Sequence, residues 1–97
     1  MSEVIIKSAQ SEAVRGQLEA ALNSQRRMLV GGIERTRRKM AAFEAQYGYG
    51  TSELLRREAE GDVDDGDLGL VEWLGEARTL VRLKSDLAVL EDIQVCS

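Results

Sequence analysis

The chain has 97 residues, a net charge of -4 and an apolar fraction of 43%, and only four of its residues are aromatic. This length allows one small domain at most. With no histidine and a single cysteine, zinc sites and histidine-dependent catalysis are excluded, and a chain this acidic is not a general binder of polyanions.

The lone cysteine, Cys96, rules out an internal disulfide and predicts a reducing, cytoplasmic location. No basic-then-apolar leader opens the chain and no run of 18 apolar residues occurs, so we expect neither secretion nor a membrane span. No pattern indicates a cofactor, and we predict none.

Charge is divided unevenly along the chain. Residues 1–47 hold eight basic and five acidic groups, a net of +3, whereas residues 48–97 hold five basic and twelve acidic groups, a net of -7. The two halves either attract each other in an antiparallel hairpin or carry solvated faces that differ in sign. Exposed pairs of this kind contribute at most about 1 kcal/mol each.

Residues 1–7 contain a short β-branched run, Val4, Ile5 and Ile6. We expect this segment to be extended. It either tucks against the following helix or, across residues 3–7, forms a strand that pairs with a second copy or with the sheet edge of a partner.

An uninterrupted helical pattern predicts a long helix over residues 8–47, in a chain without proline. Its seam steps alternately by four and three residues, as in a coiled coil, with a phase shift at Gly31 and Gly32. These two glycines predict a kink or a close helix crossing. The seam residues are Leu18, Leu22, Gln25, Leu29, Ile33, Thr36, Met40, Phe43 and Tyr47.

Glycines punctuate the second half of the chain. Gly48 predicts a left-handed end to the long helix, and Thr51 or Ser52 is expected to cap a short helix over residues 51–60, which Gly61 ends. Residues 61–67 form an acidic loop that has nothing to bury.

Asp67 is expected to cap a second long helix over residues 68–93. Its apolar positions recur every seven residues, and Leu74, Ala77 and Val81 widen the stripe enough to be covered on two sides. The seam consists of Trp73, Leu80, Leu83, Leu87 and Leu90.

The acidic loop does not match a calcium-binding EF-hand. Aligning the EF-hand glycine on Gly66 places Gly61 and Val63 where carboxylates are required, and starting the loop at Asp62 places Trp73 at the closing position of a glutamate. We therefore expect a solvated linker, or an acidic hook for a basic partner, and no metal site.

A basic cluster lies in the first long helix. On a helix its side chains spread around the cylinder, and no aromatic residues interleave with them as stacking platforms. The cluster is a solvated face, a match for an acidic surface, or a site of nucleic-acid contact, and we treat nucleic acid as an improbable partner. Its members are Arg26, Arg27, Arg35, Arg37, Arg38 and Lys39.

One succession of motifs resembles a known group of proteins. It runs through Ala42-Phe43-Glu44-Ala45-Gln46-Tyr47-Gly48, Thr51-Ser52-Glu53-Leu54, an acidic stretch, Glu72-Trp73 and Leu90-Glu91-Asp92-Ile93. In this order, over roughly residues 35–95, the chain resembles small bacterial and archaeal proteins encoded beside a toxin, the TumA-like antitoxins among them. The resemblance implies a cytoplasmic protein without catalytic residues that wraps and neutralises a small toxin, such as an RNase-like or nucleotidyltransferase-like one.

Taken together, the sequence predicts an all-α, coiled-coil-like hairpin of one domain, 1–97, that binds a protein partner and is not an enzyme. The first alternative is a homodimer in which the long seams pair between copies, and the second is a small nucleic-acid-binding regulator. Trp73, Tyr47 and Tyr49 suit either the hairpin core or a partner interface. The predicted partner-binding residues are Tyr47, Tyr49, Leu54, Leu55, Asp62, Asp64, Asp65, Asp67 and Trp73.

Overall fold

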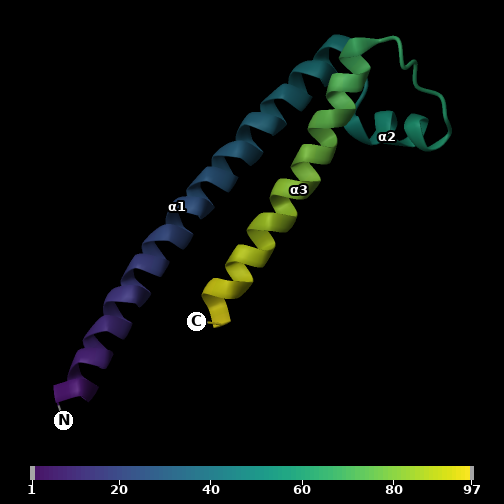
Figure 1. Ribbon diagram of the computed structural model, residues 1–97. Helices are drawn as coiled ribbons and strands as arrows, with labels where there is room; N and C mark the ends of the chain where they lie inside the picture. The colour runs from purple at the N-terminus through teal and green to yellow at the C-terminus, as the bar shows by residue number, and fades with distance from the viewer. Residues whose placement is uncertain (1, 97) are drawn as a thin grey trace.

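Three helices make up the chain: α1 (Ser2–Tyr47), α2 (Thr51–Ala59) and α3 (Leu68–Cys96). The computed structural model describes the backbone of residues 2–96 and the side chains of residues 10–93. The two long helices run antiparallel, and α2 lies beside the end at which they are connected (Figure 1). The predicted all-α hairpin with a short elbow helix is therefore confirmed.

The expectation of an extended N-terminal segment is wrong, because α1 already begins at Ser2 and includes residues 3–7. The preference of Val4, Ile5 and Ile6 for strands is weak and depends on a neighbouring strand. Within residues 2–96 no strand is present to provide one. Extending a helix that already exists costs much less than nucleating one, so the helix continues back to Ser2.

The predicted seams hold the hairpin together from Leu22 onward. On α1, Leu29 and Thr36 are buried, and on α3, Trp73 and Leu90 are buried. The other predicted seam positions from Leu22 onward are partly buried, except Gln25, which is exposed. The heptad spacing thus identified the faces through which α1 and α3 pack.

The two adjacent glycines of α1 serve a close approach between helices. α1 passes through Gly31 and Gly32 without a break. A Cβ atom on Gly32 would lie 3.3 Å from Cδ1 of Leu83 on α3, which is a tight contact. Of the two expected outcomes, a kink or a close helix crossing, this contact confirms the close crossing.

Two left-handed glycines form the turns at the elbow, as predicted. Gly48 has φ of 81° and donates its N–H to the carbonyl of Glu44, which ends α1. Gly61 has φ of 72°. Its backbone N–H donates to the carbonyl of Glu58, and the N–H of Asp62 donates to the carbonyl of Arg57, which is the hydrogen-bond pattern of a Schellman motif. α2 therefore ends at a defined turn, and α3 begins after a short loop.

The two long helices differ greatly in length. α1 has 46 residues and α3 has 29, and the rod measures 70 × 22 × 20 Å. Arg26 pairs with Glu91, which lies five residues before the end of α3, so α3 stops about level with residue 21 of α1. We call residues 2–20, which extend beyond that point, the α1 overhang; Figure 1 shows it as the single helix running to the N-terminus.

Candidate partner-binding surface

An aromatic cluster occupies the elbow, where the C-terminal end of α1 meets the start of α3. The Trp73 side chain is 0% exposed. Its ring centroid lies 6.0 Å from that of Phe43, 5.7 Å from that of Tyr47 and 5.3 Å from that of Tyr49. Leu54 from α2, also fully buried, and Leu74 complete the core. All four aromatic residues of the chain therefore stabilise the elbow.

The buried indole of Trp73 is satisfied by a chain of hydrogen bonds that links all three helices. Its Nε1–H donates to Oγ1 of Thr51 at 2.9 Å, and that hydroxyl lies 3.0 Å from Oε2 of Glu44, to which it donates. The backbone N–H of Thr51 donates to the same carboxylate oxygen at 2.7 Å. Glu44 of α1 thus takes the role expected of Thr51 or Ser52 as the cap of α2, where Gly50 is the N-cap and makes no side-chain cap bond.

Asp67 fastens the start of α3 to the end of α1. Its Oδ1 accepts the backbone N–H of Gly69 at 3.0 Å and that of Leu70 at 3.2 Å, so the predicted cap is confirmed. The same atom accepts the hydroxyl of Tyr47 at 2.8 Å. The Tyr47 hydroxyl, together with the backbone donors, lowers the pKa of Asp67. The hydrogen bond to Asp67, with some burial, raises the pKa of Tyr47.

Several residues predicted to bind a partner are used by the elbow itself. Leu54 and Trp73 have no exposed surface, so we correct their assignment from partner contacts to core residues. Tyr47 and Tyr49 are half-buried in the aromatic cluster, and Asp67 is the cap of α3. The reason is physical: the elbow is the thickest part of a thin rod, so its aromatic residues are the ones that gain most from burial.

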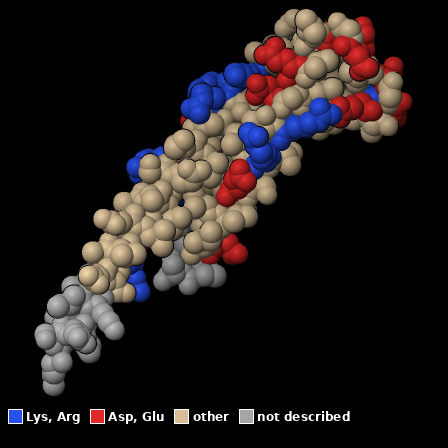
Figure 2. Space-filling model, in the orientation of Figure 1, with Lys and Arg blue, Asp and Glu red and all other residues tan. Residues whose placement is uncertain are grey.

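The remaining predicted contacts lie on the surface. Leu55 is 42% exposed, and Asp62, Asp64 and Asp65 are exposed in the loop between α2 and α3. Figure 2 shows acidic side chains gathered at the elbow end of the rod. The structure therefore brings one large apolar side chain and a cluster of carboxylates to the same end of the molecule.

Leu55 borders a shallow groove between α2 and α3. The groove, of about 200 Å³, is lined by Leu55, Ala77, Arg78 and Val81. Val81 is 69% exposed, whereas Leu74 and Ala77, on the same widened face of α3, are buried. Because Arg78 is paired with Glu58 of α2, α2 is held beside the groove. The apolar face of α3 thus continues past the edge of α2 into solvent.

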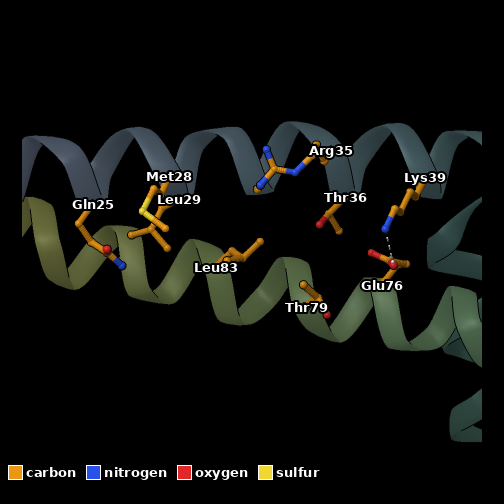
Figure 3. A pocket seen from close by; sticks show the side chains of 10 residues that line it. Gln25, Met28, Leu29, Arg35, Thr36, Lys39, Glu76, Thr79 and Leu83 are labelled. Carbon is orange, nitrogen blue, oxygen red and sulfur yellow. Dashed lines mark ion pairs between the residues drawn. The ribbon is translucent and has the colours of Figure 1, made fainter.

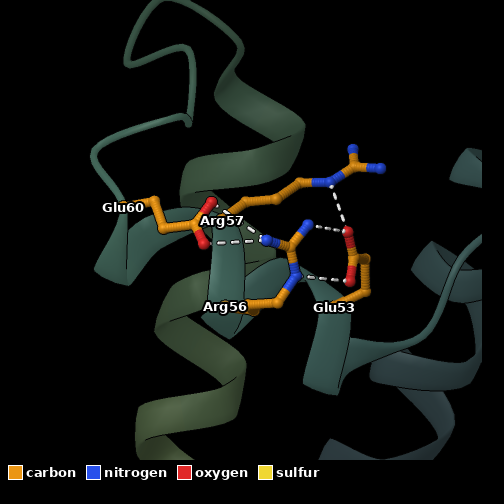
Figure 4. Close-up of polar contacts among 4 residues, drawn as sticks. All are labelled: Glu53, Arg56, Arg57 and Glu60. Atoms are coloured by element: carbon orange, nitrogen blue, oxygen red, sulfur yellow. Dashed lines mark hydrogen bonds and ion pairs between the residues drawn. The ribbon is translucent and has the colours of Figure 1, made fainter.

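The outer face of α2 carries a compact network of ion pairs, shown in Figure 4. Arg56 contacts Glu53 at 2.6 Å and Glu60 at 2.9 Å, and Arg57 contacts Glu53 at 3.0 Å. The hydrogen bonds from Arg56 and then Arg57 lower the pKa of Glu53 from 4.5 to about 2. The guanidinium of Arg57 also lies 4.0 Å above the ring of Tyr49. These contacts join the helix surface to the aromatic cluster beneath it.

The basic cluster of α1 is divided among different surroundings. Arg26 pairs with Glu91 at 3.8 Å and Lys39 with Glu76 at 3.5 Å, so two of its members match the acidic α3. Arg27, Arg37 and Arg38 are exposed. As expected for a helix, the cluster does not form one narrow face. Contact with nucleic acid at these residues remains a prediction.

A hollow between α1 and α3 is lined by both polar and apolar side chains. This hollow of about 350 Å³ lies between Gln25 at one end and the Lys39–Glu76 pair at the other (Figure 3). Arg35 and Thr36 of α1 and Thr79 of α3 also line it. Arg35 is the basic residue that comes closest to the Cβ position of Gly31, at 3.2 Å. Met28, Leu29 and Leu83 contribute the apolar part of the lining.

An apolar hollow on the α1 overhang was not predicted from the sequence. Val14 of the α1 overhang is exposed and lines a hollow together with Leu18 and Leu22, two residues of the predicted seam. The signal was present in the predicted lengths, since a helix over residues 8–47 cannot be covered along its whole length by one over residues 68–93.

The described residues contain no group of histidine, cysteine, aspartate or glutamate side chains arranged to hold a metal ion. Nor does any helix in that part of the chain have the length and apolar character needed to cross a membrane.

Comparison of the chain with models of protein families, with curated proteins and with solved structures gave no match.

Proposed function

We propose that this chain is a non-catalytic protein-binding module, and that it acts as the antitoxin that neutralises a cognate small toxin. The observation that carries the proposal is the exposed apolar groove at Leu55 and Val81, at the same end of the rod as the exposed carboxylates. An apolar contact flanked by charge is the usual composition of a specific protein interface. The resemblance to TumA-like antitoxins supplies the class of partner.

The two parts of the surface have different tasks in this proposal. Leu55 and Val81 supply the apolar contact that gives affinity. Asp62, Asp64 and Asp65 face a basic surface of the toxin and occupy the place of its nucleic-acid substrate. Such charge complementarity speeds association and makes it sensitive to salt. Asp67 is not part of this surface, since it caps α3.

The experiment is co-expression with the product of the neighbouring reading frame in a bacterial host. We expect the neighbour alone to arrest growth and the wild-type chain to relieve the arrest. A Leu55→Asp/Val81→Asp variant loses this relief. Val71→Asp is the matched control, because Val71 is another exposed apolar residue on α3, outside the groove. A neighbour without effect on growth, or relief by the groove variant equal to that by wild type, would overturn the proposal.

The carboxylates are tested separately by replacing Asp62, Asp64 and Asp65 with asparagine. Asparagine retains the side-chain oxygen with which Asp64 accepts the N–H of Gly66, so the loop keeps its turn. We expect weaker binding of the toxin and a smaller dependence of affinity on salt. Affinity and salt dependence equal to those of wild type would remove substrate mimicry from the proposal and leave the groove.

A further inference from the structure

The described side chains of the α1 overhang, from residue 10 onward, have no neighbouring helix. Residues 10–21 are all exposed, whereas Leu22 is partly buried and Leu29 is buried. At 1.5 Å per residue the overhang is about 28 Å long. So long a segment of isolated helix gains no stability from packing.

The surface of the overhang has the form of a coiled-coil binding site. Its hollow, of about 360 Å³, is lined by Ser11, Val14, Arg15, Leu18, Glu19 and Leu22. Residues at i, i+3, i+4 and i+7 make up the hole that receives a knob from a neighbouring helix. The first hole is formed by residues 11, 14, 15 and 18, and the second by residues 15, 18, 19 and 22. The hollow therefore fits the side chains of another helix.

This face is continuous with the interface inside the hairpin. The seam that packs α1 on α3 at Leu29 steps back through Gln25 and Leu22 to Leu18, alternately by four and three residues. Two more such steps reach Arg15 and Ser11. The overhang thus presents the same face that α3, Leu68–Cys96, covers farther along.

We propose that the overhang of a second copy of this chain covers the face, forming an antiparallel dimer. The overhang of a second copy has the same length and, over the described side chains from residue 10, the same stripe, so the contact is the self-complementary one of a two-fold dimer. Residues 10–20 carry Glu12, Arg15 and Glu19, a net charge of -1, so this part of the stripe holds no block of like charge. On the face drawn in Figure 2, the described part of the rod beyond α3 is mostly tan, with few charged side chains.

The direction of the second copy follows from the position of α3. A parallel copy packed on this face collides with α3 from about residue 21 onward, because α3 already occupies the seam there. An antiparallel copy instead brings the N-terminal end of its α1 to the C-terminal end of the first copy's α3. These helix ends carry opposite partial charges and attract each other. The overhang of each copy then lies end to end with the other copy's α3.

The dimer has a length that distinguishes it from other arrangements. Each rod is 70 Å long, and an antiparallel overlap of about 28 Å gives a particle about 110 Å long. Hairpins that associate side by side, as in a four-helix bundle, remain close to the length of one rod. This inference does not depend on the proposed function, because the toxin-binding groove lies at the opposite end of the molecule.

The test is sedimentation equilibrium of the full chain from micromolar to near-millimolar concentration, with small-angle X-ray scattering of the same samples. We expect a monomer–dimer equilibrium and a maximum dimension near 110 Å for the dimer. Leu18→Glu should raise the dimer Kd by at least about tenfold. Leu18 is 52% exposed in the single chain, so the substitution leaves the hairpin folded, which circular dichroism verifies.

Val89→Glu is the matched control, since Val89 is similarly exposed but lies on α3, outside the overhang. Its dimer Kd should stay close to that of wild type. Three results would each overturn the proposal: a wild-type chain that is monomeric throughout, a dimer no longer than one rod, or a Leu18→Glu variant that dimerises as wild type does.

Discussion

The elbow and the α1 overhang are the two ends of one rod, and they are stabilised by different forces. At the elbow, side chains from three helices surround Trp73, and hydrogen bonds of Thr51, Glu44 and Asp67 join the helices. In the overhang a single helix has every described side chain up to residue 21 exposed. Burial stabilises the elbow, whereas the overhang relies on intrinsic helix propensity, and an isolated helix of this length is only marginally stable.

With only four aromatic residues, the chain makes a stable hairpin. By placing all of them at the elbow, it concentrates its apolar burial where the chain reverses direction. The long seams then need only leucine, small residues and the approach at Gly32. The free end is left to interact with another molecule. Four variants or conditions test this comparison.

The largest expected effect is that of Trp73→Ala. Removing a fully buried aromatic side chain costs about 3–5 kcal/mol of the free energy of unfolding. Leu18→Ala, measured at concentrations where the chain is monomeric, should cost less than about 0.5 kcal/mol beyond its small change in propensity. Urea denaturation followed by circular dichroism gives both values. Equal costs for the two variants would mean that the elbow is not the stabilising end.

Asp67→Ala removes the acceptor of two backbone donors of α3 and of the Tyr47 hydroxyl. We expect a loss of about 0.5–2 kcal/mol, the usual cost of removing a helix cap. Asp65→Ala, in the same loop and exposed, should change stability by less than about 0.5 kcal/mol. If the two variants are equally stable in urea, the link between α1 and α3 at Asp67 contributes nothing.

Gly16→Ala tests whether the overhang is an uncovered helix of low stability. A Cβ atom at Gly16 meets nothing within 4 Å, and replacing a glycine inside a helix by alanine gains about 0.5–1 kcal/mol of helix stability. We expect slower amide hydrogen exchange in the overhang and unchanged exchange at the elbow. Gly32→Ala should gain less, because its Cβ lies 3.3 Å from Leu83 and that side chain must move. A larger gain at Gly32 would contradict the close approach of α1 and α3.

The smallest effect is that of pH on the elbow. The folded pKa of Glu53 is lowered from 4.5 to about 2, and that of Asp67 is also lowered. A lowered pKa contributes stability that is present above the unfolded value and is lost as the pH falls through the folded one. The urea concentration at the unfolding midpoint should therefore decrease as the pH is lowered from 4.5 to about 2. Glu53→Gln should flatten this fall, and an equally steep fall in the variant would assign the acid sensitivity to other groups.

Much of the fold could be predicted because it depends on local spacing. The seven-residue recurrence from Trp73 to Leu87 sets the buried face of α3, and the left-handed turns require Gly48 and Gly61. Asp67 caps the helix that begins one residue later. Each of these is a relation between residues within about two turns of one another, and a sequence displays such relations directly.

The features that could not be predicted depend on how separate helices meet. The capping of α2 by Glu44 depends on the turn between α1 and α2, and the contact between Trp73 and Thr51 requires the hairpin to close first. For the same reason the sequence could not show that the elbow would bury Leu54 and leave Leu55 exposed. The β-branched run at Val4 was misleading because strand propensity has no effect without a second strand.

Amide hydrogen exchange, measured residue by residue at a low and a high protein concentration, tests the central claim most directly. We predict that amides of the elbow, such as those of Leu54 and Trp73, exchange slowly and equally at both concentrations. Amides near Leu18 should exchange fast in the dilute sample and become protected as concentration rises. Overhang amides already as protected in the dilute sample as those of the elbow, or unprotected in both samples, would contradict the account of a free helical end that a second copy covers.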